Sequence, residues 1–422
     1  MINKGESLSL TTREPKLFYG YIIVLASFFA IAVMWGTMYS YGVFFEPMLT
    51  EFGWARATAS AAYSFCLFFG DVLSIATGKL TDRFGPRLVI TGCGLFFGLG
   101  YILMSQITVI WQLYLLYGAI IGAGMSGSFI PLVSTIARWF VKRRGTMTGI
   151  AMAGGGMGVM IIPPMVRWLI SNYGWRISYI IVGIIILVLL ILLAQFLKRD
   201  PTQIGQLSYR GKESKESSLN LGAGGFSLRQ AIHTRQFWLL CLIFAAILFS
   251  ISGVVVHIAI HATGLGISAT SAANIFIFIG GGSIIGRIVM GIAGDKLGNK
   301  SAMIVGFILM SAALFWLLVA KEIWILYLFG AIFGFANHGL MVLMSPMAAE
   351  LFGLTSHGMI FGVIHTGGAI GEGSGPVVVG RIYDITGSYR LGFLVSATIG
   401  VIGILATLLL RPTSHKGGNK YD

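Results

Sequence analysis

One basic side chain of this sequence lies where charge is costly. Arg287 falls inside the apolar run 269–293, eight residues before Asp295, so at about 1.5 Å per residue it lies about 12 Å along a helix from that end. An arginine at the centre of an apolar layer costs about 2.5–3.5 kcal/mol, and it should therefore line a cavity and face an anion. Its planar fork of donors matches a carboxylate. The alternative is a structural ion pair with Asp71 or Glu372.

Three titratable residues in other apolar runs are candidates for proton exchange. Asp71 lies eleven residues before Asp82, which places it at a similar depth. His365 and Glu372 are seven residues apart and share one helix face, and histidine is the usual proton exchanger near neutral pH. Static roles are the alternatives: a helix-dipole or Arg287 partner for Asp71, and a packing histidine at position 365.

Four further residues are candidates for the wall of a binding cavity. Asn337 lies halfway along the run 323–349, and its amide could bind a hydroxyl or a carbonyl. Phe129, Phe335 and Phe361 could form an apolar wall, although in a chain with 29 phenylalanines lipid contact or core packing explains them equally well.

A membrane fold is needed to position these residues. The chain of 422 residues is 56% hydrophobic and only 10% charged, whereas soluble domains have about 25% charged residues. Runs of about 20 apolar residues are long enough to cross a bilayer. They predict an all-α membrane protein with twelve helices, at 18–41, 57–80, 88–107, 109–137, 146–169, 175–197, 236–261, 269–293, 301–320, 323–349, 357–383 and 390–411.

The basic residues indicate the orientation of the chain. With both termini placed in the cytoplasm, 22 of the 29 lysines and arginines fall in inner segments and five in outer loops, as the positive-inside rule requires. The net charge of +14 therefore faces anionic lipid, and we exclude nucleic acid as a partner. We expect a multi-pass protein of the cell inner (plasma) membrane with cytoplasmic termini.

An internal repeat divides the chain into halves. Residues 78–87 are echoed by 291–300, an offset of 213 residues, and the same offset maps the glycine-rich segment 145–158 onto 358–371. Such duplication is typical of membrane transporters. It predicts a tail at 1–17, a helical half at 18–197, a cytoplasmic linker at 198–235 with a short helix near its end, a second half at 236–411 and a tail at 412–422.

The repeated loop also has candidate conformational residues. An aspartate at a helix end can bind basic side chains or the N-terminus of another helix. We therefore predict that Asp82 and Asp295, with Arg83 and Arg87 in the first copy, latch one conformation of the protein.

The first copy, 78–87, resembles the G-x-L-x-D-R-x-G-x-R pattern of the major facilitator superfamily. That resemblance implies two pseudo-symmetric six-helix bundles, a midplane cavity and alternating access. Four other segments make the chain similar to the monocarboxylate transporters and the oxalate:formate antiporter group: 19–21, 41–45, 138–145 leading into 151–154, and 287–291.

The narrower resemblance implies roles for individual positions. It places the substrate-binding arginine at Arg287, and it places an acidic residue of the monocarboxylate transporters at Ser283 and one of their lysines at Tyr39. A lysine of the oxalate antiporter corresponds to Gly368, and a tyrosine to Phe129. With one cationic side chain remaining, a monoanion is expected rather than a dianion.

These observations predict a secondary transporter of small monocarboxylates such as lactate, pyruvate or acetate, coupled to a proton. The alternatives are a carboxylate exchanger of the oxalate:formate type and a membrane carboxylate sensor that does not transport. We expect a monomer in contact with membrane lipid, and no enzymatic activity, cofactor or metal site.

Overall fold

A computed structural model describes residues 18–54, 56–204 and 225–411. The predicted tails at 1–17 and 412–422 and the middle of the predicted linker lie outside the described residues. At the end of that linker a short helix, α9 (Leu228–Ile232), confirms the expected one, with Ser227 capping its first turn.

The N-terminal half folds into helices that follow the predicted spans closely. The first span is longer than expected, because α1 (Gly20–Tyr39) continues after one residue into α2 (Tyr41–Phe52). The next spans are α3 (Arg56–Phe84) and α4 (Pro86–Met104). The spans predicted at 146–169 and 175–197 form one long element, α8 (Arg144–Phe196), whose two arms meet at Gly174, where φ is 74°. Only glycine adopts this backbone conformation at little cost.

The fourth predicted span, 109–137, is wrong as a single helix. It consists of α5 (Ile110–Leu113), the π-helical stretch Tyr114–Ile121, α6 (Gly122–Met125) and α7 (Ile130–Trp139). The chain leaves helical geometry between α6 and α7, and the hydroxyl of Thr77 on α3 donates to the carbonyl of Ser126 at this break. A neighbouring helix thus satisfies a backbone group freed within the apolar region.

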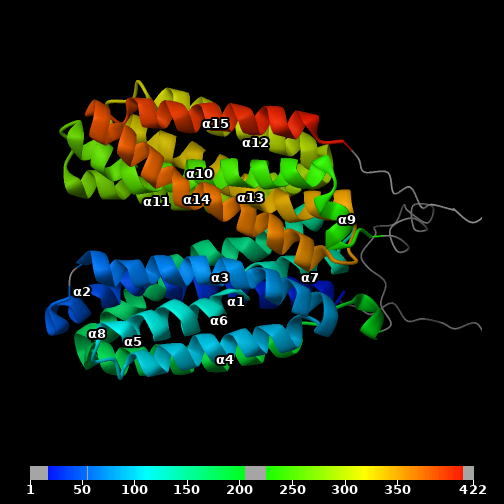
Figure 1. Ribbon diagram of the computed structural model, residues 1–422, viewed down its shortest axis with the longest axis horizontal. Helices are drawn as coiled ribbons and strands as arrows, with labels where there is room; N and C mark the ends of the chain where they lie inside the picture. The colour runs from blue at the N-terminus through cyan, green and yellow to red at the C-terminus, as the bar shows by residue number, and fades with distance from the viewer. Residues whose placement is uncertain (1–17, 55, 205–224, 412–422) are drawn as a thin grey trace, which may run out of the picture.

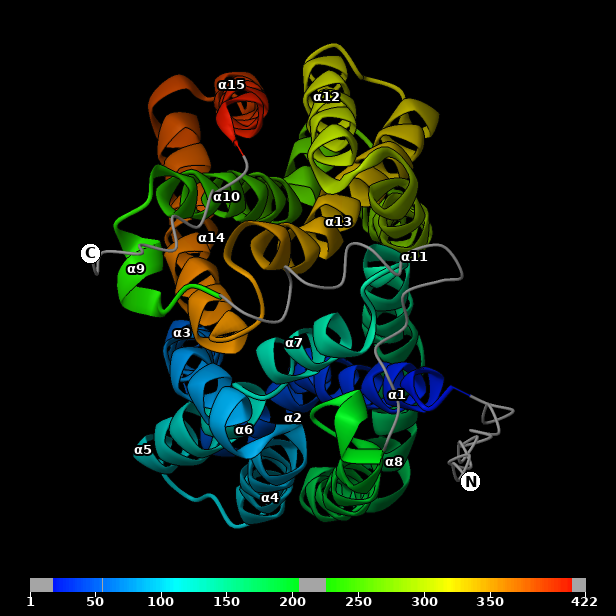
Figure 2. The ribbon, with the colours of Figure 1, turned by 90° about the vertical axis from the view of Figure 1, so that its right-hand side faces the viewer.

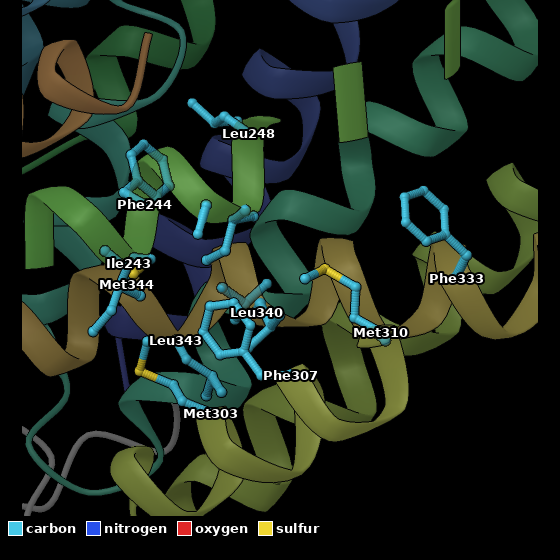
Figure 3. Close-up of a cluster of buried hydrophobic side chains, with 14 of the residues drawn as sticks. Ile243, Phe244, Leu248, Met303, Phe307, Met310, Phe333, Leu340, Leu343 and Met344 are labelled. Carbon is cyan, nitrogen blue, oxygen red and sulfur yellow. The ribbon is translucent and has the colours of Figure 1, made fainter. Parts of the chain in front are cut away.

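The C-terminal half contains six long helices at the predicted places. They are α10 (Arg235–Gly264), α11 (Ala269–Leu297), α12 (Asn299–Leu317), α13 (Ile323–Phe352), α14 (His357–Thr386) and α15 (Arg390–Leu409). Figure 3 shows part of their hydrophobic core, where Phe244 on α10, Phe307 on α12 and Leu340 on α13 pack together.

The helices are of membrane-spanning length. Ten helical stretches in the described residues are long and apolar enough to cross a bilayer, and α8, with 53 residues, counts as one of the ten although it has two arms. The glycine-rich α14, which carries His365, Glu372, Arg381 and Asp384, is not among the ten. Counting the two arms of α8 separately and adding α14 gives the twelve predicted spans.

The helices form two bundles, one from each half of the chain (Figure 1). Seen along the helices, α14 lies beside α3 and α11 beside α8 (Figure 2). We call these two contacts the α3–α14 seam and the α8–α11 seam. They are equivalent in the repeat, and any site between the bundles is flanked by both.

The seams are tight at the end of the molecule where Asp82 and Asp295 lie. A Cβ added to Gly145 would come 2.5 Å from the carbonyl oxygen of Gly291, and one added to Gly358 would come 2.7 Å from that of Gly78. Further along the same helices, a Cβ on Gly280 or Gly373 would meet no atom within 4 Å. The bundles are therefore in backbone contact at the end where Asp82 and Asp295 lie.

Candidate functional site

Arg287 reaches from α11 across the α8–α11 seam. Its Nη1 donates to the carbonyl oxygen of Met152 on α8 at 2.8 Å. Its Nε is buried and has no hydrogen-bond partner among the residues that the structure describes. The side chain as a whole is only partly buried. A guanidinium in the middle of a spanning helix thus has unsatisfied donors and an accessible surface.

The alternative of a structural ion pair for Arg287 is not realised in this conformation. Within the described part of the chain, no carboxylate lies within salt-bridge distance of Arg287, neither Asp71 nor Glu372. A buried charge is normally paired or solvated. The charge of Arg287 therefore needs an anion or water to compensate it.

Tyr39 is a predicted binding residue that interacts electrostatically with Arg287 from the N-terminal bundle. It lies at the end of α1, is 53% exposed, and interacts electrostatically with both Arg287 and Glu372. Because Arg287 and Glu372 belong to two different helices of the C-terminal bundle, Tyr39 faces the space between the bundles. The ring of Trp35 lies tilted against the tyrosine from the same helix, at 6.1 Å between ring centroids.

The helix α8 leaves space for the guanidinium through a glycine. A Cβ on Gly155 would lie 3.4 Å from Nη1 of Arg287 and 3.9 Å from Cβ of Trp35. Ser283, one helical turn from Arg287, is buried and donates its hydroxyl to the carbonyl of Gly280. The serine hydroxyl is therefore used within its own helix in this conformation.

The two polar residues in the middle of α13 point in different directions. Asn337 is fully buried and donates to the carbonyl of Ile247 on α10 at 3.2 Å, inside the C-terminal bundle. His338 is the residue that the sequence analysis did not single out: it interacts electrostatically with Arg287. Helical spacing alone could not predict which of Asn337 and His338 faces α11, because this depends on how α11 and α13 cross.

Two of the three predicted wall phenylalanines meet at one place, and the third does not. Phe129, at the start of α7, and Phe361 on α14 have ring centroids 5.8 Å apart. Phe335 lines an apolar hollow between α11, α12 and α13 with the exposed Ile277 and Ile285. Such a surface suits lipid contact, which was the alternative for these phenylalanines.

The proton-exchange candidates lie together on the α3–α14 seam. Nδ1 of His365 is 3.6 Å from Oδ1 of Asp71, and Thr366 donates to the backbone carbonyl of Asp71 at 3.0 Å. Glu372 interacts electrostatically with both Asp71 and His365. The rings of Phe129 and Phe244 flank His365, with centroids at 5.3 and 5.2 Å. A titratable pair thus bridges the two bundles.

The repeated aspartates bind the starts of helices in the opposite bundle. Asp295 accepts the backbone N–H groups of Gly145 and Thr146, at 2.8 and 2.7 Å, at the start of α8. Asp82 accepts those of Gly358 and Met359, at 3.2 and 3.0 Å, at the start of α14. Helix N-termini bind anions in this way. The two contacts are related by the 213-residue offset.

The basic partner of Asp82 comes from outside the repeated loop. Arg138 at the end of α7 pairs with Asp82 at 2.8 Å. Arg83 instead lies over the ring of Phe84, 5.0 Å from its centroid, and Arg87 is exposed. Adjacent residues of a helix point about 100° apart, so Arg83 cannot share the direction of Asp82.

Known proteins resemble this chain in sequence over most of its length. A family model described as Major Facilitator Superfamily matches residues 25–291 and 239–421. The chain is 27% identical over 404 residues to monocarboxylate transporter 13 of Rattus norvegicus, covering 94% of this chain and 90% of that protein. It is 26% identical over 423 residues to monocarboxylate transporter 12 of Homo sapiens, covering 93% and 80%.

Solved structures show the same fold at lower identity. The proton:xylose symporter XylE matches with a TM-score of 0.70 and 15% identity, over 93% of this chain and 96% of that one. The transporter FucP, in its outward conformation, matches with a TM-score of 0.71 and 15% identity, over 93% and 100%. At this identity the likeness concerns the fold.

Proposed function

This chain belongs to the Major Facilitator Superfamily, and we propose that it carries small monocarboxylates such as lactate, pyruvate or acetate across the membrane together with a proton. It is a multi-pass membrane transporter related to the monocarboxylate transporters. The observation that carries the proposal is the Arg287 guanidinium, which is placed between the bundles with a buried, unpartnered Nε.

A carboxylate supplies the negative charge and the hydrogen-bond acceptors that Arg287 lacks in this conformation. It is a planar anion that accepts two parallel hydrogen bonds from a guanidinium, and such charge-assisted bonds are about twice as strong as neutral ones. It would replace the hydration that the charge loses inside the bilayer. Tyr39, exposed towards the same space, is the residue of the N-terminal bundle that closes on the bound anion.

A monoanion suits this site better than a dianion. The two positions at which the related transporters carry a second cation hold Tyr39 and Gly368 here. Gly368 packs against the ring of Phe244, where an added Cβ would overlap the ring. A second carboxylate would therefore remain without a counter-charge.

Uptake into proteoliposomes tests this function. An inward proton gradient should drive labelled lactate into vesicles that contain no substrate, whereas an obligate exchanger needs substrate inside and a sensor gives no flux in either case. Uptake that is driven only by internal oxalate or another dicarboxylate would replace the proposal with exchange.

We assign proton coupling to Asp71, His365 and Glu372. The Asp71–His365 pair joins the bundles across the α3–α14 seam, so its separation changes when the bundles rock. A proton held between two moving helices links protonation to conformation.

Replacing Asp71 with asparagine is expected to remove the response of uptake to a proton gradient while lactate counterflow continues. Asparagine keeps the shape of the side chain but cannot take up the proton. The matched control is Asp384→Asn, which changes an exposed carboxylate on α14. Gradient-driven uptake of wild-type size by Asp71→Asn would remove Asp71 from the coupling.

The latch role of Asp82 and Asp295 belongs to the same proposal. Asparagine at position 295 has one acceptor oxygen where the carboxylate has two, so it cannot accept from both Gly145 and Thr146. We expect Asp295→Asn to increase opening at this end by about tenfold, since hydrogen bonds to charged groups contribute about 1.5–3 kcal/mol. Deuterium labelling of the backbone amides at the start of α8 would measure it, without changing Thr146, whose hydroxyl also donates to Asp295. Unchanged labelling would show that the Asp295 carboxylate does not keep this end of the α8–α11 seam closed.

For placement in the cell we propose the inner (plasma) membrane, with both termini cytoplasmic and the tight ends of the seams on the cytoplasmic side. The distribution of basic residues supports this orientation. The conformation described here is then closed towards the cytoplasm. Self-contained bundles with a site between them are consistent with a working monomer.

A further inference from the structure

We propose that His338 selects 2-hydroxy monocarboxylates, by accepting a hydrogen bond from the substrate hydroxyl while Arg287 holds the carboxylate. This inference rests on the proposed function, because it concerns the same site. It divides the small monocarboxylates into those with a hydroxyl donor beside the carboxylate and those without one.

Close packing of α11 on α13 brings His338 to Arg287. A Cβ on Gly339 would lie 3.0 Å from the carbonyl oxygen of Gly286, so these two glycines are in backbone contact. Arg287 directly follows Gly286 in the sequence, and His338 directly precedes Gly339. The two side chains also interact electrostatically. They therefore approach the space between the bundles from adjacent helices.

The hydrogen bond that His338 already makes determines what its other nitrogen can do. Nδ1 lies 3.2 Å from the carbonyl oxygen of Gly334, an atom that can only accept, so Nδ1 carries the hydrogen. A second positive charge beside the guanidinium would be repelled, which leaves the ring neutral with Nε2 as an acceptor. Nε2 makes no hydrogen bond within the described part of the chain, and the side chain is only partly buried.

An acceptor beside a cation fits one arrangement of substrate groups. The carboxylate of a 2-hydroxy acid binds Arg287, and its hydroxyl donates to Nε2. A 2-oxo acid presents a carbonyl oxygen there, so two acceptors face each other, and an unsubstituted acid leaves Nε2 without a partner. Sites built to bind a substrate hydroxyl discriminate strongly against analogues that lack it.

The other polar residues considered for substrate binding do not supply the same function. Ser283 uses its hydroxyl within α11 and Asn337 uses its amide within the C-terminal bundle. Tyr39 approaches from the opposite bundle with a hydroxyl that can donate or accept and so does not discriminate. The imidazole of His338 is therefore the group that selects substrates with a hydroxyl donor.

Competition experiments test the proposal on the whole protein in proteoliposomes. Uptake of labelled racemic lactate is inhibited with unlabelled lactate, pyruvate or propionate, and the three inhibition constants are compared. For the wild type we expect pyruvate and propionate to inhibit about tenfold more weakly than lactate. In His338→Phe, which keeps a ring of similar size, the preference for lactate should disappear while inhibition by propionate is unchanged.

Two further variants separate the possible outcomes. His338→Gln keeps an acceptor oxygen and should retain part of the preference, which a purely structural histidine would not explain. Equal inhibition by lactate and propionate in the wild type overturns the role of His338, and so does a preference that persists in His338→Phe. In either case the proposed function stands if uptake still requires Arg287, and it fails if Arg287→Ala transports normally.

Discussion

Replacing Arg287 with alanine is expected to reduce lactate uptake by on the order of 100-fold or more, while the protein still inserts in the membrane. The substitution removes two charge-assisted hydrogen bonds to the carboxylate, each contributing about 1.5–3 kcal/mol. It also removes the only bond that the guanidinium makes in the described structure, to the carbonyl of Met152. That carbonyl belongs to α8 and does not need the arginine to remain satisfied, so folding should not suffer.

Two controls make this result specific. Arg287→Lys retains the charge but not the fork, and we expect it to recover little of the uptake. Arg381→Ala removes an exposed arginine from α14 and should transport like the wild type. Membrane levels of all three variants must be compared by immunoblot. Normal uptake by Arg287→Ala would mean that the carboxylate binds elsewhere.

Replacing Gly78 with alanine is expected to reduce uptake at least tenfold by a different route, because it keeps the two bundles apart. A Cβ at this position would overlap the carbonyl of Gly358 across the α3–α14 seam. A backbone contact of this kind cannot relax through a side-chain rotation, so α3 and α14 must separate. The conformation with this end closed then becomes unfavourable, and alternating access stops.

The separation can be measured directly. Spin labels at the exposed positions Lys79 on α3 and Thr355 just before α14 should move apart in the Gly78→Ala variant. The measurement needs a background in which the three native cysteines are replaced by alanine. Gly92→Ala is the matched control, since alanine adds the same helix propensity there and meets no atom within 4 Å. Unchanged distances and uptake in Gly78→Ala would show that this contact opens freely.

Some of the fold followed from the sequence because it depends on local and repeated patterns. Apolar runs of spanning length predicted the helices, and the 213-residue offset related the glycine-rich segments and the aspartate loops of the two halves. Asp82 and Asp295 bind equivalent helix starts in the structure. The break between α6 and α7 was missed, although Ser126, Gly127, Ser128 and Pro131 are local signals for it, and the bond that satisfies Ser126 comes from another helix.

The site was harder to predict because it depends on how helices cross. Arg287 stood out by its charge alone, whereas His338 and Asn337, adjacent in sequence, differ only in which helix each one faces. The partner of Asp82 could not be predicted for the same reason: Arg138 approaches from another helix, while Arg83 is its neighbour only along the chain.

The two seams are alike in shape and different in chemistry at the level of the site. By the repeat, Arg287 corresponds to Ser74 and Met152 to His365. On the α8–α11 seam an arginine reaches a backbone carbonyl, and on the α3–α14 seam an aspartate faces a histidine. In the proposed function, one seam offers a fixed cation to the substrate and the other offers groups that exchange a proton. This difference between the seams is the basis for proposing coupled transport of an anion and a proton.

Thermal stability of the purified protein during titration with lactate tests the central claim most directly, because it reports binding without requiring transport. A ligand that binds only the folded protein raises the unfolding temperature as its concentration passes the dissociation constant. We expect lactate to stabilise the wild type in this way and to leave Arg287→Ala unchanged. Equal stabilisation of both proteins, or stabilisation by dicarboxylates and not by lactate, would contradict carboxylate binding at Arg287 as proposed.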